Sequence, residues 1–203
     1  SYTYDGKTKE PSVKVYDKTG KVISAANYTI SRSSGRKEPG TYTVKVTFKG
    51  NYSGALSSSF KIQLGKIKGV KNGTLKTDSV QIKWNKLTGA TNYQIYRYDP
   101  AKKKYVKLKT VSSGKSSYTD KKREAARAYK YKIRAYRSTG GKTSYSSYSD
   151  VLYTAAKPKK VSALTAKKKT KNSVKLTWKK TTRADGYQIY RYNSTKKKWE
   201  KVT

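Results

Sequence analysis

Lysine, arginine and tyrosine are the side chains in this sequence that are best able to bind a ligand. The 203 residues include 49 Lys and Arg and 20 Tyr but only 11 Asp and Glu, so the formal net charge is +38. Such a surplus of cations attracts polyanions, and tyrosine rings stack on sugar rings and nucleobases. The composition therefore favours recognition of an anionic polymer or a glycan.

The same composition argues against catalysis and metal binding. The sequence contains neither His nor Cys, which removes the commonest general base, the usual metal ligands and the usual catalytic triads. The 11 carboxylates are scattered along the chain, and most fall in predicted turns, where Asp stabilises the local backbone. The many lysines also oppose a calcium site, which needs clustered oxygen ligands. We expect no enzyme activity, no catalytic residue, no metal and no cofactor.

A repeat sets the organisation of the chain. The string YQIYRY occurs at residues 93–98 and again, 94 residues later, at residues 187–192. The same shift aligns two tryptophans and two lysine triplets, namely Trp84 with Trp178, and Lys102, Lys103 and Lys104 with Lys196, Lys197 and Lys198. More than a third of residues 65–109 are identical in the second copy. The chain therefore holds two copies of one module, and the second stops about half way through.

Apolar residues inside the module recur at every second position, which is typical of strands that turn one face toward a core. These residues are Val80, Ile82 and Trp84; Tyr93 and Ile95; and Tyr129, Tyr131, Ile133 and Ala135. The segments between them are rich in Gly, Asn, Asp, Pro and Ser, as turns are. Short strands at this spacing predict a β-sandwich. For residues 121–128 we expect a loop with at most one turn.

The segment GATNYQIYRYDPAKKKYVKLKTV, followed by YTDK and by a Y-x-Y-x-I-x-A run, resembles the fibronectin type III repeats of large bacterial surface proteins. The resemblance covers residues 65–156, and residues 157–203 without the later strands. It implies that the strand holding Tyr93 pairs with the strand that begins near Tyr129. One position departs from the family, because Arg123 stands where a Leu is usual. An Arg stem covers apolar surface but fills a corner less well, so we expect a softer corner there.

Residues 1–64 do not match the repeat, but they contain YDG near the start and GTYTVKV and GNYSG near the centre. These motifs resemble short bacterial immunoglobulin-like repeats, which normally have a further strand before YDG. We therefore expect an all-β chain of tandem immunoglobulin-like and fibronectin type III β-sandwiches. Its expected domains are an immunoglobulin-like repeat without its first strand at 1–64, a complete fibronectin type III domain at 65–156 and a partial one at 157–203. Both ends then look cut, and the partial domain should be unstable unless something pairs with its strand edges.

The candidate site lies on the outward face of the two paired strands. Gln94, Tyr96 and Tyr98 should point outward beside Lys130, Lys132, Arg134 and Tyr136, because alternate residues share a face. These side chains either only cover the sheet, with cations over tyrosine rings, or form a basic aromatic platform for a sugar or nucleobase. The candidate ligand-binding residues are Tyr96, Tyr98, Lys132, Arg134 and Tyr136, together with Lys102, Lys103 and Lys104 in the hairpin that follows.

The lysine clusters and the family resemblance leave several functions open. Lysine on strand edges opposes edge-to-edge aggregation, whereas clustered cations bind teichoic acid, sulfated or sialylated glycans, or DNA in a salt-dependent way. We expect an extracellular stalk or adhesin segment, secreted or attached to a cell wall, that spaces neighbouring domains of the same chain. The alternatives are a carbohydrate-binding or polyanion-binding module and an accessory spacer of a polysaccharide-degrading enzyme. Nucleic acid is a weaker expectation, and no apolar run reaches the roughly 18 residues of a membrane span.

Overall fold

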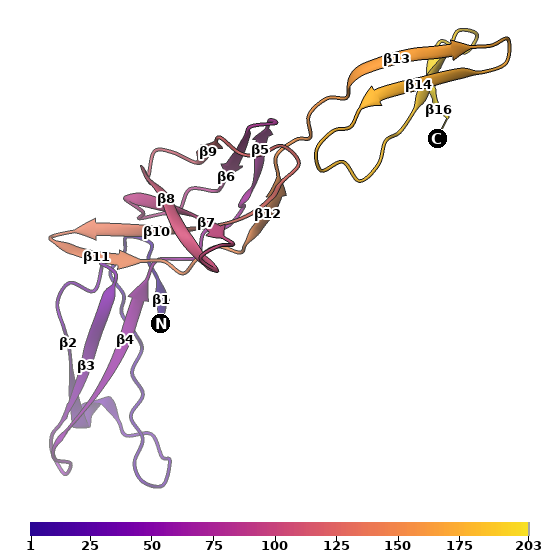
Figure 1. Ribbon diagram of the computed structural model, residues 1–203. Coiled ribbons are helices and arrows are strands. Elements are labelled where there is room, and N and C mark those ends of the chain that lie inside the picture. Colours follow the sequence, from indigo (N-terminus) through magenta and orange to yellow (C-terminus); the bar gives the residue numbers. More distant parts are fainter. Residues whose placement is uncertain (203) are drawn as a thin grey trace. The chain divides into compact units, whose positions relative to one another are not determined.

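The computed structural model describes residues 1–202 and consists of strands joined by turns and loops (Figure 1). The helical structure in that range is one short 3-10 turn, η1 (Ala25–Asn27). The strands are β1 (Tyr2–Thr3), β2 (Tyr28–Arg32), β3 (Gly40–Phe48), β4 (Ala55–Gln63), β5 (Lys71–Leu75), β6 (Ser79–Lys83), β7 (Asn92–Asp99), β8 (Lys104–Ser112), β9 (Ser117–Lys121), β10 (Ala128–Thr139), β11 (Lys142–Tyr145), β12 (Leu152–Ala155), β13 (Ser162–Lys169), β14 (Val174–Lys179), β15 (Tyr190–Asn193) and β16 (Lys198–Lys201). The prediction of an all-β fold is confirmed.

The described residues form two compact units. The first comprises Ser1–Lys71, Lys83–Tyr118 and Lys130–Leu152. The second comprises Asn72–Ile82, Thr119–Tyr129 and the described residues from Tyr153 onward. The first unit holds a four-stranded sheet and most of a five-stranded sheet, and the second holds most of a three-stranded sheet and two hairpins.

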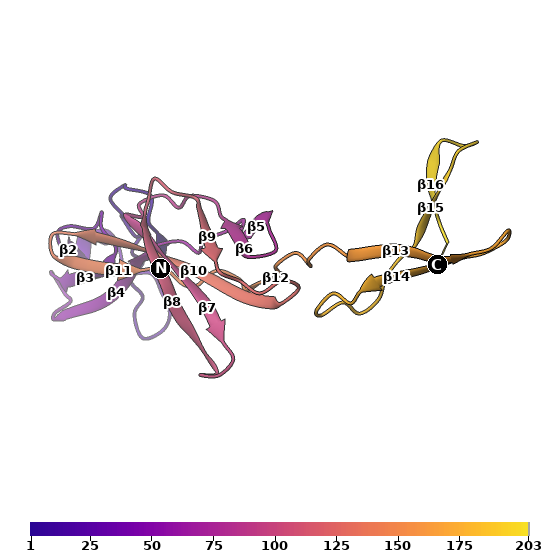
Figure 2. The same ribbon diagram turned by 45° about the horizontal axis from the view of Figure 1, so that its top comes forward.

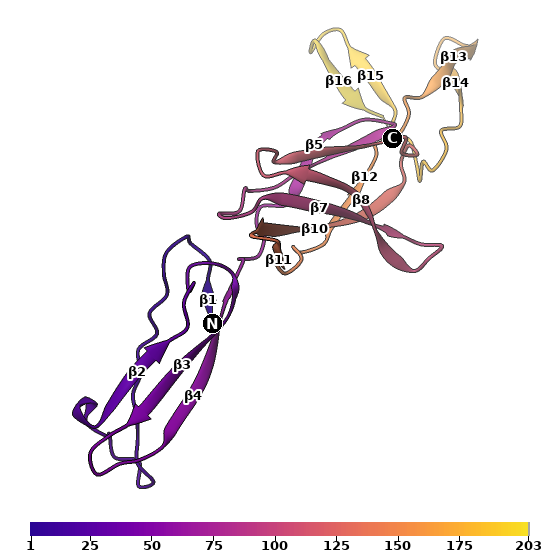
Figure 3. The ribbon, with the colours of Figure 1, turned by 90° about the vertical axis from the view of Figure 1, so that its left-hand side faces the viewer.

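The four-stranded sheet has the order β1-β4-β3-β2 (Figure 3). Neighbouring strands β2, β3 and β4 are antiparallel, whereas β1 runs parallel to β4 and pairs with it at only two positions, Tyr2 with Ile62 and Thr3 with Gln63. Alternate residues of β3 and β4 face the core, as period two requires. One cluster of buried side chains joins this sheet to the loop that precedes it, and its members are Val15, Ile23, Tyr28 and Val46.

The five-stranded sheet has the order β11-β10-β7-β8, with β12 also paired to β10. β7 and β10 are antiparallel, and Ile133 lies opposite Ile95 while Ala135 lies opposite Tyr93. These four side chains are fully buried. The structure thus confirms that the strand holding Tyr93 pairs with the Y-x-Y-x-I-x-A strand, and it confirms which face of each strand enters the core.

The three-stranded sheet has the order β5-β6-β9, and its residues Val80 and Ile82 are fully buried. The corner before β10 is closed by the hydroxyl of Tyr129, which accepts a hydrogen bond from the backbone N–H of Glu124 at 2.9 Å. The guanidinium carbon of Arg123 lies 5.5 Å from the centre of the Tyr129 ring, so the arginine contacts this corner through its head group. Of the segment 121–128, residues 122–127 form the predicted loop with a turn, while Lys121 ends β9 and Ala128 begins β10.

Two separate hairpins, β13 with β14 and β15 with β16, make up the strands of the second copy (Figure 2). Only the last three residues of the second YQIYRY string belong to a strand, and Tyr190 and Tyr192 are about half exposed. The cause is the number of partner strands, because β7 lies between β10 and β8, whereas within residues 1–202 β15 pairs only with β16.

One local hydrogen bond is present in both copies of the module. The hydroxyl of Tyr93 accepts from the backbone N–H of Leu87 at 2.8 Å, and the hydroxyl of Tyr187 accepts from the backbone N–H of Thr181 at 2.7 Å. In each copy the tyrosine ring also packs edge-on against the tryptophan of the same copy. These contacts therefore follow from the local sequence in both environments.

Candidate functional site

The register of β7 and β10 brings most of the candidate residues onto one face of the five-stranded sheet. Lys132 lies opposite Tyr96, and Arg134 lies opposite Gln94. Directly opposite residues of antiparallel strands point the same way, so these side chains share the face that turns away from the buried isoleucines. We call this surface the tyrosine–cation face, and it consists of Tyr96, Tyr98, Tyr105, Lys132, Arg134, Tyr136, Tyr145 and Tyr148.

Lys132 is held between two tyrosine rings. Its Nζ atom lies 4.3 Å from the centre of the Tyr105 ring and 3.8 Å from the centre of the Tyr148 ring. An ammonium group at this distance is attracted by the negative face of the ring, by about 0.5–1 kcal/mol at a partly exposed site. The Tyr148 ring also packs edge-on against Tyr96 at 5.3 Å. The lysine is therefore fixed in place by aromatic side chains.

Arg134 contacts three rings and one amide. Its guanidinium carbon lies 4.1 Å from the centre of the Tyr145 ring, 5.2 Å from that of Tyr148 and 5.6 Å from that of Tyr96. Its Nε donates to Oε1 of Gln94 at 2.9 Å. The planar guanidinium suits both contacts, because it stacks on rings and donates within its own plane.

Gln94 points outward as expected, but other side chains cover it. Gln94 is only 7% exposed. Its Oε1 accepts hydrogen bonds from the Tyr96 hydroxyl at 2.8 Å and from Arg134. Long side chains on the neighbouring strands lie flat across this face, so a residue can point away from the core and still be covered.

The outer part of the face is built from further tyrosine pairs. Tyr98 packs edge-on against Tyr105 at 5.4 Å, and Nζ of Lys130 lies 5.5 Å from the centre of the Tyr98 ring. Tyr136 lies opposite Tyr145 on β11, with the ring centres 5.6 Å apart. All five residues first predicted for the sheet face, Tyr96, Tyr98, Lys132, Arg134 and Tyr136, are therefore brought together on one surface.

The three lysines predicted in the hairpin occupy a different place. Lys102 and Lys103 are exposed in the turn after β7, and Lys104 begins β8 opposite Asp99. The Asp99 carboxylate accepts hydrogen bonds from the backbone N–H groups of Ala101 and Lys102 and so shapes this turn. The lysines therefore add positive charge at the end of the strands rather than side chains on the face.

Three tyrosines of the face are not found by sequence reasoning. Tyr105 lies opposite Tyr98 in the hairpin of β7 and β8. Working out the register of that hairpin from the sequence would have identified it. Tyr145 and Tyr148 are three residues apart, and the period-two rule cannot assign both to one face.

Two serines explain how Tyr148 reaches the face. The hydroxyls of Ser146 and Ser149 accept hydrogen bonds from the backbone N–H groups of Ala135 and Ile133, at 2.9 and 3.0 Å. These bonds hold the segment after β11 along the edge of β10 in place of a regular ladder. The sequence TSYSSYS could have indicated this arrangement, but its tyrosines are three residues apart and do not follow the two-residue period of a strand.

The face carries positive charge. Burial raises the pKa of the Tyr148 hydroxyl above its ordinary value, and the hydrogen bond with Tyr96 adds to the rise, while the charges of Arg134 and Lys132 oppose it. Tyr148 therefore remains a neutral phenol near neutral pH. Within residues 1–202, neither Lys132 nor Arg134 forms an ion pair with a carboxylate. The arrangement is suited to attracting a carboxylate, sulfate or phosphate group.

The carboxylates serve turns and ion pairs in the part of the chain that is described. Asp17, for example, accepts hydrogen bonds from the backbone of Thr19 and Lys21 in its own turn. No three His, Cys, Asp or Glu side chains among residues 1–202 come close enough together to hold a metal ion. In the same range no helix has the length and apolar character needed to cross a membrane.

Comparisons with known proteins concern the fold alone. No family model matches the chain, and no curated protein matches it. Among solved structures, the chain is similar to FN3tt, with 14% identity, 46% of this chain and 95% of that chain covered, and a TM-score of 0.39. It is also similar to a segment of two fibronectin type III domains from chicken tenascin, with 14% identity, 58% of this chain and 66% of that chain covered, and a TM-score of 0.45.

The strand pairing within the chain itself defines the class of protein. Three strands pair in the order β5-β6-β9 and four in the order β11-β10-β7-β8, and the second sheet contains the expected pairing of the Tyr93 strand with the Y-x-Y-x-I-x-A strand. The chain is an all-β protein whose strands form several sheets and hairpins.

Proposed function

We propose that the chain is an extracellular structural segment of a bacterial surface or secreted protein, and that its sandwiches act as spacers between other modules. A spacer works only if consecutive modules are held to one another, since domains joined by a linker alone move independently. The observation that supports this role is a network of contacts inside the first compact unit. It joins the four-stranded sheet and its loops to the turn before β7 and to β10.

Arg137 of β10 is at the centre of this network. Its Nε donates to Oε2 of Glu38 at 2.6 Å and a terminal nitrogen donates to Oε1 at 3.0 Å, so the pair is bidentate. The same guanidinium donates to the Gly89 carbonyl at 3.2 Å and lies 4.8 Å from the centre of the Tyr4 ring. Leu87 packs against the buried cluster of Tyr4, Ile62 and Leu64. Polar and apolar contacts thus join the four-stranded sheet and its loops to β10 and the turn before β7. We call this set of contacts the junction.

Limited proteolysis with trypsin tests the spacer role. The segment between β4 and β5 contains Lys66 and Lys68, after which trypsin cleaves when the backbone can open. We expect Arg137→Ala to speed cleavage after these two lysines by several-fold, because the junction loses its ion pair and its contact with Tyr4. Cleavage after Lys103, in the exposed hairpin, serves as the internal reference. Rapid cleavage at the junction in the unchanged protein would contradict a fixed spacer.

A second candidate function is binding of an anionic glycan or cell-wall polymer on the tyrosine–cation face. What favours it is that Lys132 and Arg134 lie side by side on partly exposed surface without a carboxylate partner in the described chain. Against it, both cations already contact tyrosine rings, so these rings are partly occupied as a stacking platform. An accessory spacer of a polysaccharide-degrading enzyme would use both the contacts of the junction and the tyrosine–cation face.

Binding to sulfated glycan and to teichoic acid, measured from low to physiological salt, tests the second candidate. The double variant Lys132→Gln with Arg134→Gln removes two charges from the face, and Lys102→Gln with Lys103→Gln removes two from the hairpin. We expect the face variant to weaken binding by at least about tenfold more than the hairpin variant. Equal losses would mean that the polymer responds only to total charge. Binding that ignores salt would contradict an electrostatic site altogether.

A further inference from the structure

The hairpin at residues 93–107 is the part of the repeated module that differs least between its two copies. A quarter of residues 65–92 are identical in the second copy, whereas two thirds of residues 93–107 are. The identical residues of the hairpin include Tyr96, Tyr98 and Lys107, and none of these three is buried. Packing of the core therefore does not explain why they are the same.

One side of this hairpin has the same character in both copies. Opposite residues of antiparallel strands point the same way, so one side of β7 and β8 carries Tyr96, Tyr98, Tyr105 and Lys107. The equivalent side of the hairpin of β15 and β16 (Figure 3) carries Tyr190, Tyr192, Trp199 and Lys201. We call each set of four a ring–lysine cluster. The first cluster belongs to the tyrosine–cation face, and the second is its counterpart in the second copy.

The two clusters also have the same geometry. The ring centres of Tyr98 and Tyr105 lie 5.4 Å apart and those of Tyr192 and Trp199 lie 5.5 Å apart, edge-on in both cases. The hydroxyl of the first tyrosine in each cluster donates to the glutamine two residues before it, at 2.8 Å in the first copy and 3.0 Å in the second. All these contacts are local in the sequence, so each module builds its own cluster.

The opposite side of the same strand is not kept. Val106 points away from the first cluster, and its counterpart is Glu200, so an apolar residue becomes a charged one. Tyr105 becomes Trp199, which changes the size and removes the hydroxyl but retains a flat ring. Substitutions on an exposed surface usually change stability little. A spacer role alone therefore gives no reason to keep rings and lysines on one side only.

We propose that each ring–lysine cluster binds one stretch of an acidic polysaccharide, a polymer of sugar rings that carry carboxylate or sulfate groups. The proposal rests on the second candidate function, binding of an anionic glycan, and adds the class of polymer and a second site. A sugar ring stacks on the aromatic pair, and its acidic group lies beside Lys107 or Lys201. Within residues 1–202 neither lysine forms an ion pair with a carboxylate.

The rings of the cluster select this class of polymer. The exposed lysines of the turn, Lys102 and Lys103, attract any polyanion from a distance and do not discriminate between them. The rings discriminate, because duplex DNA keeps its bases inside the stack and a polyphosphate chain has no ring. Two sites on one chain also favour a long polymer, since binding at the second site is then intramolecular.

The test uses the whole chain with three probes, namely heparin, a heparin tetrasaccharide, and inorganic polyphosphate, which is anionic but has no ring. Tyr98→Leu and Tyr192→Leu each keep an apolar side chain over the hairpin and remove one ring. Each is expected to weaken heparin binding at least about tenfold and to halve the number of tetrasaccharides bound, with polyphosphate binding changed less than about twofold. Tyr98→Phe keeps the ring and full affinity, as does Tyr16→Leu, a change outside both clusters.

The charged half of the cluster has its own matched pair of variants. Lys107→Gln removes a charge beside the rings, and Lys103→Gln removes one from the turn, both at exposed positions. Because only the first lysine contacts the bound sugar, we expect Lys107→Gln to weaken tetrasaccharide binding at least about fivefold more than Lys103→Gln. Equal effects would contradict the assignment.

Three further results would overturn the proposal. Equal loss of heparin and polyphosphate binding in the leucine variants would assign binding to charge alone. Loss in Tyr98→Leu but not in Tyr192→Leu would leave a single site. Tighter binding of single-stranded DNA than of heparin, lost in both leucine variants, would assign the clusters to nucleic acid. Failure of the underlying glycan function looks different, because the unchanged chain would then bind neither heparin nor the tetrasaccharide even at low salt, and both proposals would fall.

Discussion

Arg137 shows how much one side chain can hold together in a highly basic protein. Its guanidinium pairs with Glu38, caps the Gly89 carbonyl and covers the Tyr4 ring. The hydrogen bond from Arg137, with the attraction of its charge, lowers the pKa of Glu38 below its ordinary value, although partial burial opposes the change. The junction is therefore linked to the ionisation of a single carboxylate.

The first prediction is that acid weakens the protein partly through Glu38. Because its pKa is lower in the folded chain, the pair contributes fully above the unfolded pKa of about 4.3 and its contribution is lost as pH falls through the folded pKa. The contribution is about 1 kcal/mol or less, since the carboxylate is 36% exposed. Urea unfolding should show Glu38→Gln less stable than the parent near neutral pH and equally stable once the carboxylate is protonated. The same loss at both pH values would contradict this linkage.

The second prediction concerns Gly89 at the same junction. Its φ is +81°, and a Cβ atom there would overlap the Tyr4 ring. Gly140 is a matched control, because its φ is +56° and a Cβ would meet no atom within 4 Å. Both changes to Ala should cost about 1 kcal/mol for the left-handed backbone, and Gly89→Ala should cost roughly 1–2 kcal/mol more because Tyr4 must move. Equal melting temperatures of the two variants would contradict this, because they would show that the Tyr4 ring moves aside without loss of stability.

At the scale of elements, the two copies of YQIYRY allow one sequence to be compared with different numbers of partner strands. The first copy lies in β7 with a strand on each side, and the second contributes only to β15, which has one partner. Local contacts are alike in both copies, so the difference in order comes from neighbouring strands rather than from the string itself.

The third prediction is therefore a difference in amide hydrogen exchange between identical sequences. Amides of residues 93–98 should exchange roughly a hundredfold more slowly than those of residues 187–192, because a strand with two partners opens only with the sheet. Mass spectrometry after digestion resolves the two strings, since their flanking residues differ. Similar rates would mean that the second copy gains partners in solution.

Much of the core was predictable because burial follows period two wherever a strand has one covered face. Val80, Ile82, Trp84, Tyr93 and Ile95 were all assigned correctly. The candidate face was predictable only in part. Gln94 points outward as expected, but long neighbours cover it, and Tyr148 reaches the face through serine hydrogen bonds that have no fixed period.

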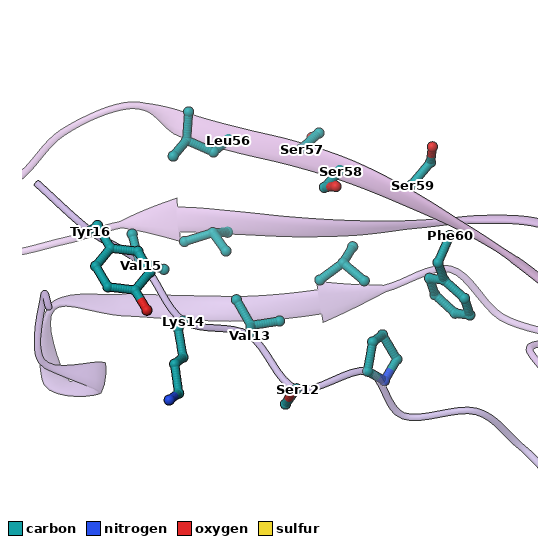
Figure 4. A pocket seen from close by; sticks show the side chains of 13 residues that line it. Ser12, Val13, Lys14, Val15, Tyr16, Leu56, Ser57, Ser58, Ser59 and Phe60 are labelled. Atoms are coloured by element: carbon teal, nitrogen blue, oxygen red, sulfur yellow. The ribbon is translucent and has the colours of Figure 1, made fainter. Parts of the chain in front are cut away.

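The exposure of Leu56 on β4 (Figure 4) was not predictable from the sequence. Alternation identifies which residues of β4 face the core, but it does not reveal whether a further strand covers them. Leu56 illustrates this, since its position opposite Val46 predicts burial and it is 56% exposed. Whether such a side chain is covered depends on which other segments pair with its strand, and alternation within one strand does not report that.

At the scale of the whole molecule, the charge of +38 should matter more than any single ion pair. The described ion pairs are mostly exposed, so water and salt screen them and each contributes little to stability. By contrast, the 49 Lys and Arg side chains repel one another throughout a 22.9 kDa protein, because only 11 Asp and Glu offset their charge.

The fourth prediction follows from that balance. Raising sodium chloride from about 0.01 M to about 0.15 M should raise the melting temperature by a few degrees, because the Debye length falls from roughly 30 Å to roughly 8 Å and screens the repulsion. Calorimetry over a salt series measures the change, with sucrose in place of salt as the uncharged control. A falling melting temperature would show that the ion pairs outweigh the repulsion.

The hydroxyl contacts of Tyr93 and Tyr187 each bridge only six residues of chain. Closing so short a loop costs little entropy, so the bend can form while most of the module is still unfolded. A growing polypeptide would acquire this bend soon after Trp84 and Tyr93 had been synthesised. In a row of such modules, each would begin to fold from its own tyrosine without waiting for the next.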